Sequence, residues 1–143
     1  MYSRSVTELP LRLEPGADLR RTLESIAREQ LPAGAFVVCG IGSLLNPRLR
    51  MAGRGEETVF SGPYEVLTLS GTVTPEGAHL HASIAAETGQ VFGGHVVYGN
   101  EVRTTVEALL VELQAWSLAR VQDKRTGFLE LQATPARGRE RGA

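Results

Sequence analysis

One helix among many β-strands is the fold that the sequence predicts, and two observations support it. A single stretch between Asp18 and Pro32 carries apolar residues at helical spacing. Most of the remaining chain alternates between apolar and polar residues or is rich in β-branched residues, which is typical of strands. With 143 residues, 42% hydrophobic and 22% charged, the chain has the size and composition of one globular domain.

The N-terminal part contains the helix and a strand that precedes it. Residues 6–13 alternate in polarity, and Pro10 favours an edge strand because proline has no N–H to donate. Asp18 is the expected N-cap of the helix, and Pro32 ends it. The expected buried stripe is Leu19, Leu23, Ile26, Ala27 and Gln30. The charged residues that surround this stripe, on an amphipathic surface helix, are Arg20, Arg21, Glu24, Arg28 and Glu29.

Strands are predicted for nearly all that follows. Their ranges are 35–45, 49–52, 57–60, 64–74, 79–86, 91–98 and 128–134. Residues 102–116 fit both patterns: Thr104-Thr105-Val106 favours a strand and 107–113 favours a helix, and a strand is preferred.

The single cysteine, Cys39, lies in an apolar run and is expected to be a buried hydrophobe in a reducing compartment. The N-terminus does not resemble a signal peptide, and no apolar run is long enough to cross a bilayer. These features predict a cytoplasmic protein without a membrane partner.

Residues 79–86 and 91–98 are predicted to form a hairpin that carries all three histidines. On the first strand, alternation places His79 and His81 on the face opposite the apolar residues. A three-residue loop, 87–89, with a left-handed glycine at its end would pair Ala86 with Gln90. That register sets His95 opposite His81 and diagonal to His79, with Cβ separations of about 5 Å and about 7–8 Å.

Three imidazoles at these separations could bind one divalent metal with nitrogen distances of about 2.0–2.1 Å, and zinc is the first candidate. Three protein ligands would leave a fourth position open, as in a catalytic or exchangeable site. The alternative is that His79, His81 and His95 are ordinary polar residues of a half-exposed sheet. A bulge at Gly93 or Gly94 would change the register and separate them.

Further candidates for a ligand pocket are Ser43, Arg50, Glu65, Arg103 and Glu107. Ser43 follows an apolar strand without the Gly-Lys-Ser/Thr ending of a P-loop, so a plain turn or bulge is favoured over a phosphate ligand or nucleophile. Arg50 could hold an anion near Ser43, although a solvated loop arginine is favoured. Arg103 and Glu107 would form an ion pair on a helix but lie farther apart on one face of a strand. Glu65 and Glu107 could act as bases near the histidines only if the fold brings them there.

Several segments in order resemble the plants-and-prokaryotes conserved (PPC) domain family, in its stand-alone bacterial form, over about residues 5–134. They are Gly40-Ile41-Gly42-Ser43-Leu44, residues 62–72, His79-Leu80-His81, Gly93-Gly94-His95 and Arg103-Thr104-Thr105-Val106-Glu107. The resemblance implies a single α+β domain, with a curved, largely antiparallel sheet flanked by one or two helices, assembled as a homotrimer. It further implies a metal site at His79, His81 and His95, at or near a subunit interface. Residues 135–143 would be a flexible tail. The segment linked to self-association would contain Gly62, Tyr64, Glu65, Val66 and Leu67.

The same resemblance raises DNA binding, because plant relatives carry the domain beside AT-hooks. Here Arg137-Gly138-Arg139 is followed by Glu140 and not by the proline of an AT-hook core. The formal net charge of −1 also lacks the basic excess typical of a DNA-binding domain. Three functions therefore stay open: a metal or small-ligand pocket, enzymatic or not; a non-enzymatic interaction module; and a DNA-associated regulator.

Overall fold

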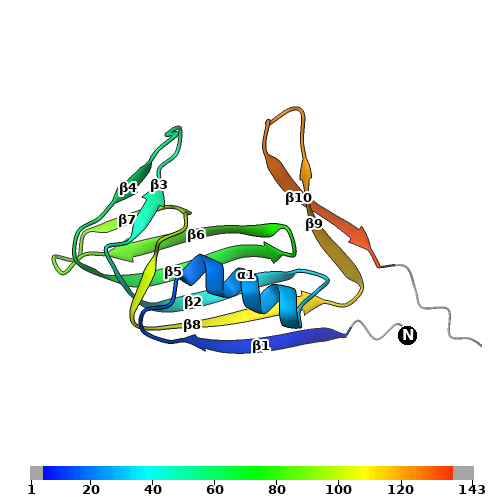
Figure 1. Cartoon of the computed structure of the whole chain (residues 1–143), viewed down its shortest axis with the longest axis horizontal. Coiled ribbons are helices and arrows are strands. Elements are labelled where there is room, and N and C mark those ends of the chain that lie inside the picture. The colour runs from blue at the N-terminus through cyan, green and yellow to red at the C-terminus, as the bar shows by residue number, and fades with distance from the viewer. Residues whose placement is uncertain (1–4, 137–143) are drawn as a thin grey trace, which may run out of the picture.

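The computed structural model describes residues 5–136, which form one helix and ten strands in two sheets (Figure 1). The large sheet has the order β1-β8-β2-β5-β6-β7-β3-β4, and the small one pairs β10 with β9. The strands are β1 (Val6–Leu13), β2 (Ala35–Leu45), β3 (Arg48–Arg50), β4 (Glu57–Val59), β5 (Pro63–Thr74), β6 (Gly77–Ala85), β7 (Val91–Val96), β8 (Glu101–Leu113), β9 (Trp116–Gln122) and β10 (Leu129–Pro135). All pairings are antiparallel and the large sheet is open, which confirms the α+β class.

The helix α1 (Leu19–Gln30) links β1 to β2, which flank β8 and run parallel to each other. Asp18 caps it as predicted, since its side chain accepts a hydrogen bond from the Arg21 N–H at 3.0 Å. β1 is an edge strand, as Pro10 indicated. Two expectations about this helix are wrong. Gln30, expected in the buried stripe, is exposed at the last position of the helix. Glu24 is not on the solvent side but is only 5% exposed, because it accepts hydrogen bonds at the end of β6.

The hydrophobic core lies between α1 and the face of the large sheet that the helix covers. Its most deeply buried members include Leu19, Leu23, Leu80, Ile84 and Leu110. Full burial of such a side chain contributes about 1.5–3 kcal/mol, so this face fixes which side of each strand points inward. On β6 the inward residues are Leu80, Ala82 and Ile84, which leaves His79 and His81 on the opposite face.

Two further expectations were wrong or incomplete. Cys39 is exposed, because the residues around Val38 and Cys39 shift register against β8 and turn both side chains outward. β9 was not predicted, whereas the ambiguous segment is indeed the strand β8. The β9–β10 hairpin projects from the end of β8 (Figure 1) and is attached to the rest of the chain by Leu118, whose N–H donates to Ala33 O at 2.7 Å.

The predicted 135–143 tail falls almost entirely outside the described residues, as does the Arg137-Gly138-Arg139 sequence. Within residues 5–136, α1 is too short and too polar to span a bilayer.

Gly71, where β5 supports β6, yields a test of the fold. Its φ is +143°, and a Cβ there would lie 2.0 Å from His79 O. We expect Gly71→Ala to lower the free energy of unfolding by about 2–4 kcal/mol, from backbone strain plus steric overlap. Gly89→Ala is the control, because its φ is also positive but its Cβ would meet open space; it should cost about 1 kcal/mol. Urea denaturation measures both, and equal losses would contradict the steric account.

Candidate metal centre

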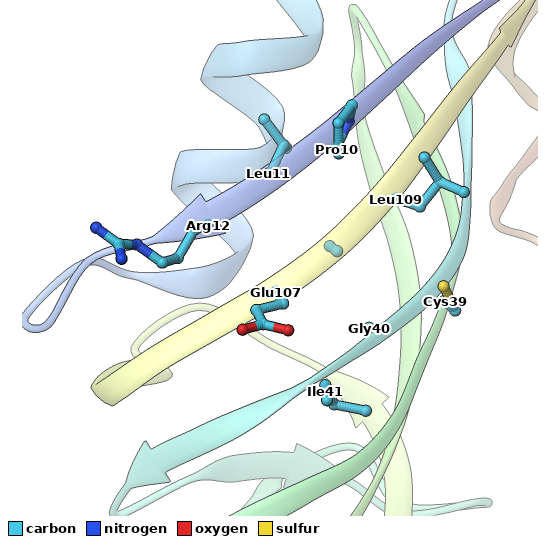
Figure 2. Close-up of a pocket in the computed structure, with 9 residues that line it drawn as sticks. Pro10, Leu11, Arg12, Cys39, Gly40, Ile41, Glu107 and Leu109 are labelled. Atoms are coloured by element: carbon cyan, nitrogen blue, oxygen red, sulfur yellow. The ribbon is translucent and has the colours of Figure 1, made fainter.

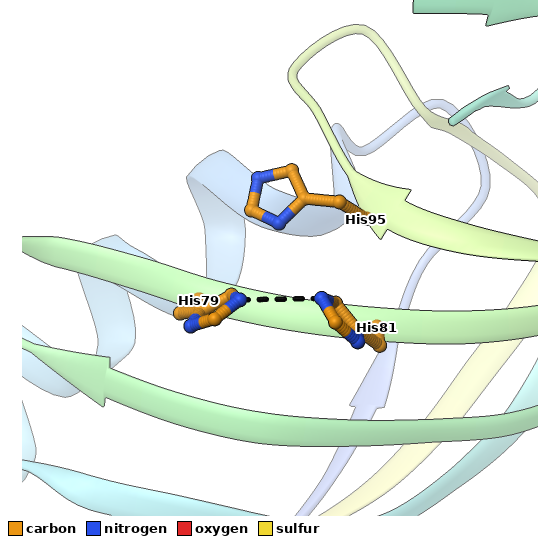
Figure 3. A group of neighbouring side chains, drawn as sticks. All are labelled: His79, His81 and His95. Atoms are coloured by element: carbon orange, nitrogen blue, oxygen red, sulfur yellow. Dashed lines mark hydrogen bonds between the residues drawn. The ribbon is translucent and has the colours of Figure 1, made fainter. Parts of the chain in front are cut away.

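The β6–β7 hairpin brings the three histidines together on one face of the sheet (Figure 3). Ala86 N–H donates to Gln90 O at 2.9 Å, and Gly89 has φ +82°, so the loop has the predicted form. The register pairs His81 with His95 without a bulge. The sequence therefore predicted this alignment correctly from the loop alone.

Gly93 and Gly94 have a different role from the bulge considered for them. A Cβ at Gly94 would lie 2.9 Å from Arg50 O, so the missing side chain lets β3 approach β7 closely. In that pairing Arg50 is the partner of His95. The glycine thus places an arginine beside the histidine cluster.

The separations between the imidazoles suit a single bound ion. His79 Nε2 and His81 Nε2 are 3.2 Å apart, and two nitrogens bound tetrahedrally to one zinc ion would be about 3.3 Å apart. One ligand atom from each of the three histidines lies within 4.8 Å of the others. His95 Nε2 is 3.4 Å from Arg20 Nη1, whereas its Nδ1 is buried without a partner among the described residues. Because a guanidinium can only donate, this contact makes Nε2 the acceptor and places the ring proton of neutral His95 on Nδ1; an ion bound through Nδ1 would have to displace that proton and break the Arg20 contact.

Two of the imidazoles are held in the neutral form that binds metals. Burial, aided by the charges of Arg50 and Arg20, lowers the pKa of His95 to about 4. Burial and then the charge of Arg120 lower the pKa of His79 below its ordinary value. These arginines repel a proton at the cluster.

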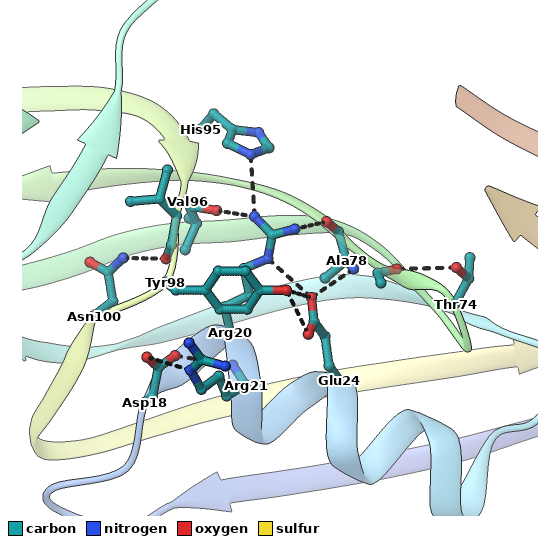
Figure 4. Close-up of polar contacts among 12 residues, drawn as sticks. Asp18, Arg20, Arg21, Glu24, Thr74, Ala78, His95, Val96, Tyr98 and Asn100 are labelled. Carbon is teal, nitrogen blue, oxygen red and sulfur yellow. Dashed lines mark hydrogen bonds and ion pairs between the residues drawn. The ribbon is translucent and has the colours of Figure 1, made fainter. Parts of the chain in front are cut away.

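A hydrogen-bonded network fixes the strand ends beneath the cluster (Figure 4). The Arg20 guanidinium donates to Ala78 O at 2.8 Å and to Val96 O at 3.1 Å, where β6 and β7 cease to pair. Glu24 accepts from Arg20 Nε, from Ala78 N–H and from the Tyr98 hydroxyl, all within 3.1 Å. Helix α1 is thereby tied to both histidine-bearing strands.

Sequence reasoning missed this network. Arg20 and Glu24 are an i,i+4 pair, and Glu24 follows the buried Leu23, which was the available signal. Nothing local to the helix indicated the strand ends as partners.

The other predicted pocket residues do not form one site. Arg50 lies beside His95, but Ser43, Glu65, Arg103 and Glu107 do not join the histidines. Ser43 is buried in β2, paired with Glu65 of β5, and its hydroxyl has no partner among the described residues. Glu107 lines a groove with Cys39 and Ile41 (Figure 2). Arg103 is exposed on β8, and within residues 5–136 it forms no ion pair with Glu107.

The predicted association segment is mixed in burial. Val66 is in the core, and the Tyr64 ring contacts Phe60 at a centroid distance of 5.7 Å. Glu65 and Leu67 are exposed, whereas Gly62 and Tyr64 are partly exposed. Val66 is the residue of this segment that another chain could not reach.

An open antiparallel sheet with one covering helix and a surface cluster of three imidazoles defines a small α+β protein with a candidate metal site. The chain belongs to the family of the Plants and Prokaryotes Conserved (PCC) domain, whose model matches residues 2–114. This confirms the family expected from the sequence motifs.

Known proteins show the same fold. A hypothetical protein from Salmonella cholerae-suis is 31% identical with a TM-score of 0.87, over 94% of this chain and 97% of that one. The metal-containing protein AF0104 from Archaeoglobus fulgidus is 25% identical with a TM-score of 0.77, over 92% and 98%.

Two curated relatives are longer proteins. The bifunctional protein GlmU of Synechococcus sp. (strain JA-2-3B'a(2-13)) is 40% identical over 129 residues, 90% of this chain and 20% of that protein. The AT-hook motif nuclear-localized protein 27 of Arabidopsis thaliana is 33% identical over 102 residues, 61% of this chain and 32% of that protein. The chain thus spans between a fifth and a third of these relatives.

The lowered pKa of His95 predicts a pH-dependent stability. Its neutral form is favoured by folding, so this contribution is complete above the unfolded pKa of about 6.5 and is lost as the pH falls towards about 4. We expect the His95 ring protons of metal-free protein to titrate near pH 4 by NMR. In urea denaturation the loss of stability over this window should be smaller for His95→Gln. An NMR midpoint near 6.5 would contradict the burial argument.

Proposed function

We propose that this protein binds one divalent metal ion per chain, with zinc as the first candidate, through His79, His81 and His95. The observation that carries the proposal is the convergence of three imidazole nitrogens within 4.8 Å on a rigid hairpin. The name of the metal-containing relative from Archaeoglobus fulgidus supports it. A bound ion with an open position would polarise a carbonyl or lower the pKa of a bound water.

The variants His79→Ala and His81→Ala test the metal site. We expect protein purified without a histidine tag to hold about one equivalent of metal, because three neutral ligands are pre-arranged. Each variant should weaken Zn²⁺ binding more than about 100-fold, beyond what loss of a supporting contact costs. Elemental analysis and isothermal titration calorimetry give the two quantities. Ser70→Ala, opposite His81 on β5, is the control and should bind normally. Wild-type protein that neither holds nor takes up metal would end the proposal.

We further propose self-association, as the homotrimer that the family resemblance implies, in the cytoplasm. The support is an apolar outer surface on which Ile41 and Leu67 are 55% and 45% exposed. It continues into the groove of Figure 2, where Cys39 lies with Pro10 and Leu109. Association through this surface would also cover Cys39, which the sequence context expects to be buried.

Analytical ultracentrifugation tests this assembly. We expect a mass near three times 15.4 kDa for the wild-type chain. Ile41→Glu should shift it towards the monomer, because it sets a charge on an apolar contact. Val121→Glu, at a similarly exposed site on β9, is the control. A wild-type monomer at high concentration would refute the assembly.

DNA binding is the second candidate, supported by the name of the Arabidopsis thaliana relative. The formal net charge of −1 argues against it, since phosphate contacts need a basic surface. A gel shift with A·T-rich duplex at low salt distinguishes the two. Salt-sensitive retardation would favour DNA binding, and no retardation would dismiss it.

A further inference from the structure

A cavity of about 520 Å³ opens beside the histidine cluster, between the large sheet and the β9–β10 hairpin. His79 and His95 form part of its wall, and Arg20, Arg50 and Arg120 surround them. Phe128 and Leu129 of the hairpin, both more than half exposed, add an apolar side. The volume is in the range of small-molecule sites.

Two of the three arginines have no ion-pair partner in the described part of the chain. Arg20 is paired with Glu24, but no carboxylate of residues 5–136 lies within 4.0 Å of the Arg50 or Arg120 guanidinium. Arg120 donates from Nη2 to Thr72 Oγ1, while its Nε is buried without a partner among residues 5–136. An acceptor in the cavity, such as the oxygen of an anion, would satisfy this unused donor of the partly buried guanidinium.

The charges around the cavity favour an anion once the metal is bound. Glu76 and Glu130 also line it, and they offset Arg50 and Arg120 in formal charge. Glu76 is already an acceptor for the Arg120 backbone N–H, at 3.3 Å. Three neutral imidazoles bring no negative charge, so a dication at the cluster is uncompensated. An anionic ligand at the open position would balance it.

We propose that this cavity binds a small molecule through an oxyanion group, a carboxylate or a phosphate, held by Arg50 and Arg120 beside the histidine cluster. The inference rests on the proposed metal site and names the ligand class of that site. Arg50 is the register partner of His95 and Arg120 lines the cavity together with His79, so the cavity wall has an arginine near each of these two histidines. Arginine forks match the planar or tetrahedral oxygens of such groups.

The hairpin gives this chain a wall that the family model does not describe. The matched residues end at 114, whereas Arg120, Phe128 and Leu129 come from β9, β10 and their connection. The histidines belong to the matched part. The hairpin therefore supplies the apolar wall and one of the two arginines of the proposed site.

Calorimetric titrations with inorganic phosphate and with acetate test the proposal, on metal-free and on Co²⁺-loaded protein. We expect binding that is tighter in the Co²⁺ form, with a change in the visible absorption bands of Co²⁺. Arg50→Gln and Arg120→Gln should each weaken anion binding about tenfold or more, as expected for loss of a charged hydrogen bond. Neither should weaken Co²⁺ binding, because each removes a repelling charge. Whichever anion binds more tightly identifies the oxyanion.

Two further variants are controls for charge and for misfolding. Arg28→Gln removes the same charge from an exposed site on α1 and should bind anions normally. Arg120→Lys keeps the charge and loses the fork; an intermediate affinity, with an unchanged circular dichroism spectrum, excludes misfolding as the cause. Anion binding that is absent, or equal in all variants, would overturn the proposal. If Co²⁺ does not bind at all, the metal function fails, while the metal-free titrations decide the arginine pocket separately: arginine-dependent binding upholds it and its absence overturns it.

Discussion

The pairing of His81 with His95 is the constraint on which the candidate site depends. Side chains alternate along a strand, so a slip of one residue would turn His95 to the core face and bring an apolar residue out. The buried Leu80 and Ile84 oppose such a slip on β6, and the 87–89 loop opposes it at the turn. Gly94 adds a third restraint, because only a glycine there admits β3 at its observed distance. Core packing, loop conformation and backbone approach therefore agree on one register.

The Arg20–Glu24 pair transmits that order to the helix. A ladder that ends leaves backbone carbonyls without partners, and Arg20 satisfies those of Ala78 and Val96 with one planar group. Glu24 holds the guanidinium in place and accepts the Ala78 N–H as well. The same guanidinium lies 3.4 Å from His95, so it both supports the end of β7 and raises the positive potential at this histidine.

Local signals were sufficient for every strand except β9, for the helix cap and for the histidine alignment, because period, capping residue and loop length act over a few residues. They failed where the determinant is distant in sequence. Glu24 is buried because of Ala78 and Tyr98, and Cys39 is exposed because β2 shifts register against β8. Arg120 contacts Thr72 of β5 from β9, a strand whose weak alternation gives little local signal. Arg50 was predicted as a pocket residue near Ser43, but its place beside His95 follows from the β3–β7 pairing, which the sequence did not indicate.

The β9–β10 hairpin touches the rest of the chain through few hydrogen bonds, chiefly those of Leu118 and Arg120. The two walls of the cavity are consequently held in place by different interactions. Core packing and strand register hold the histidine wall, so most substitutions there would alter stability or register. The hairpin wall depends only on the pairing of β9 with β10 and on the contacts of Leu118 and Arg120. A substitution in the hairpin can therefore change the apolar wall and the Arg120 side of the cavity while it leaves the geometry of the histidine cluster intact.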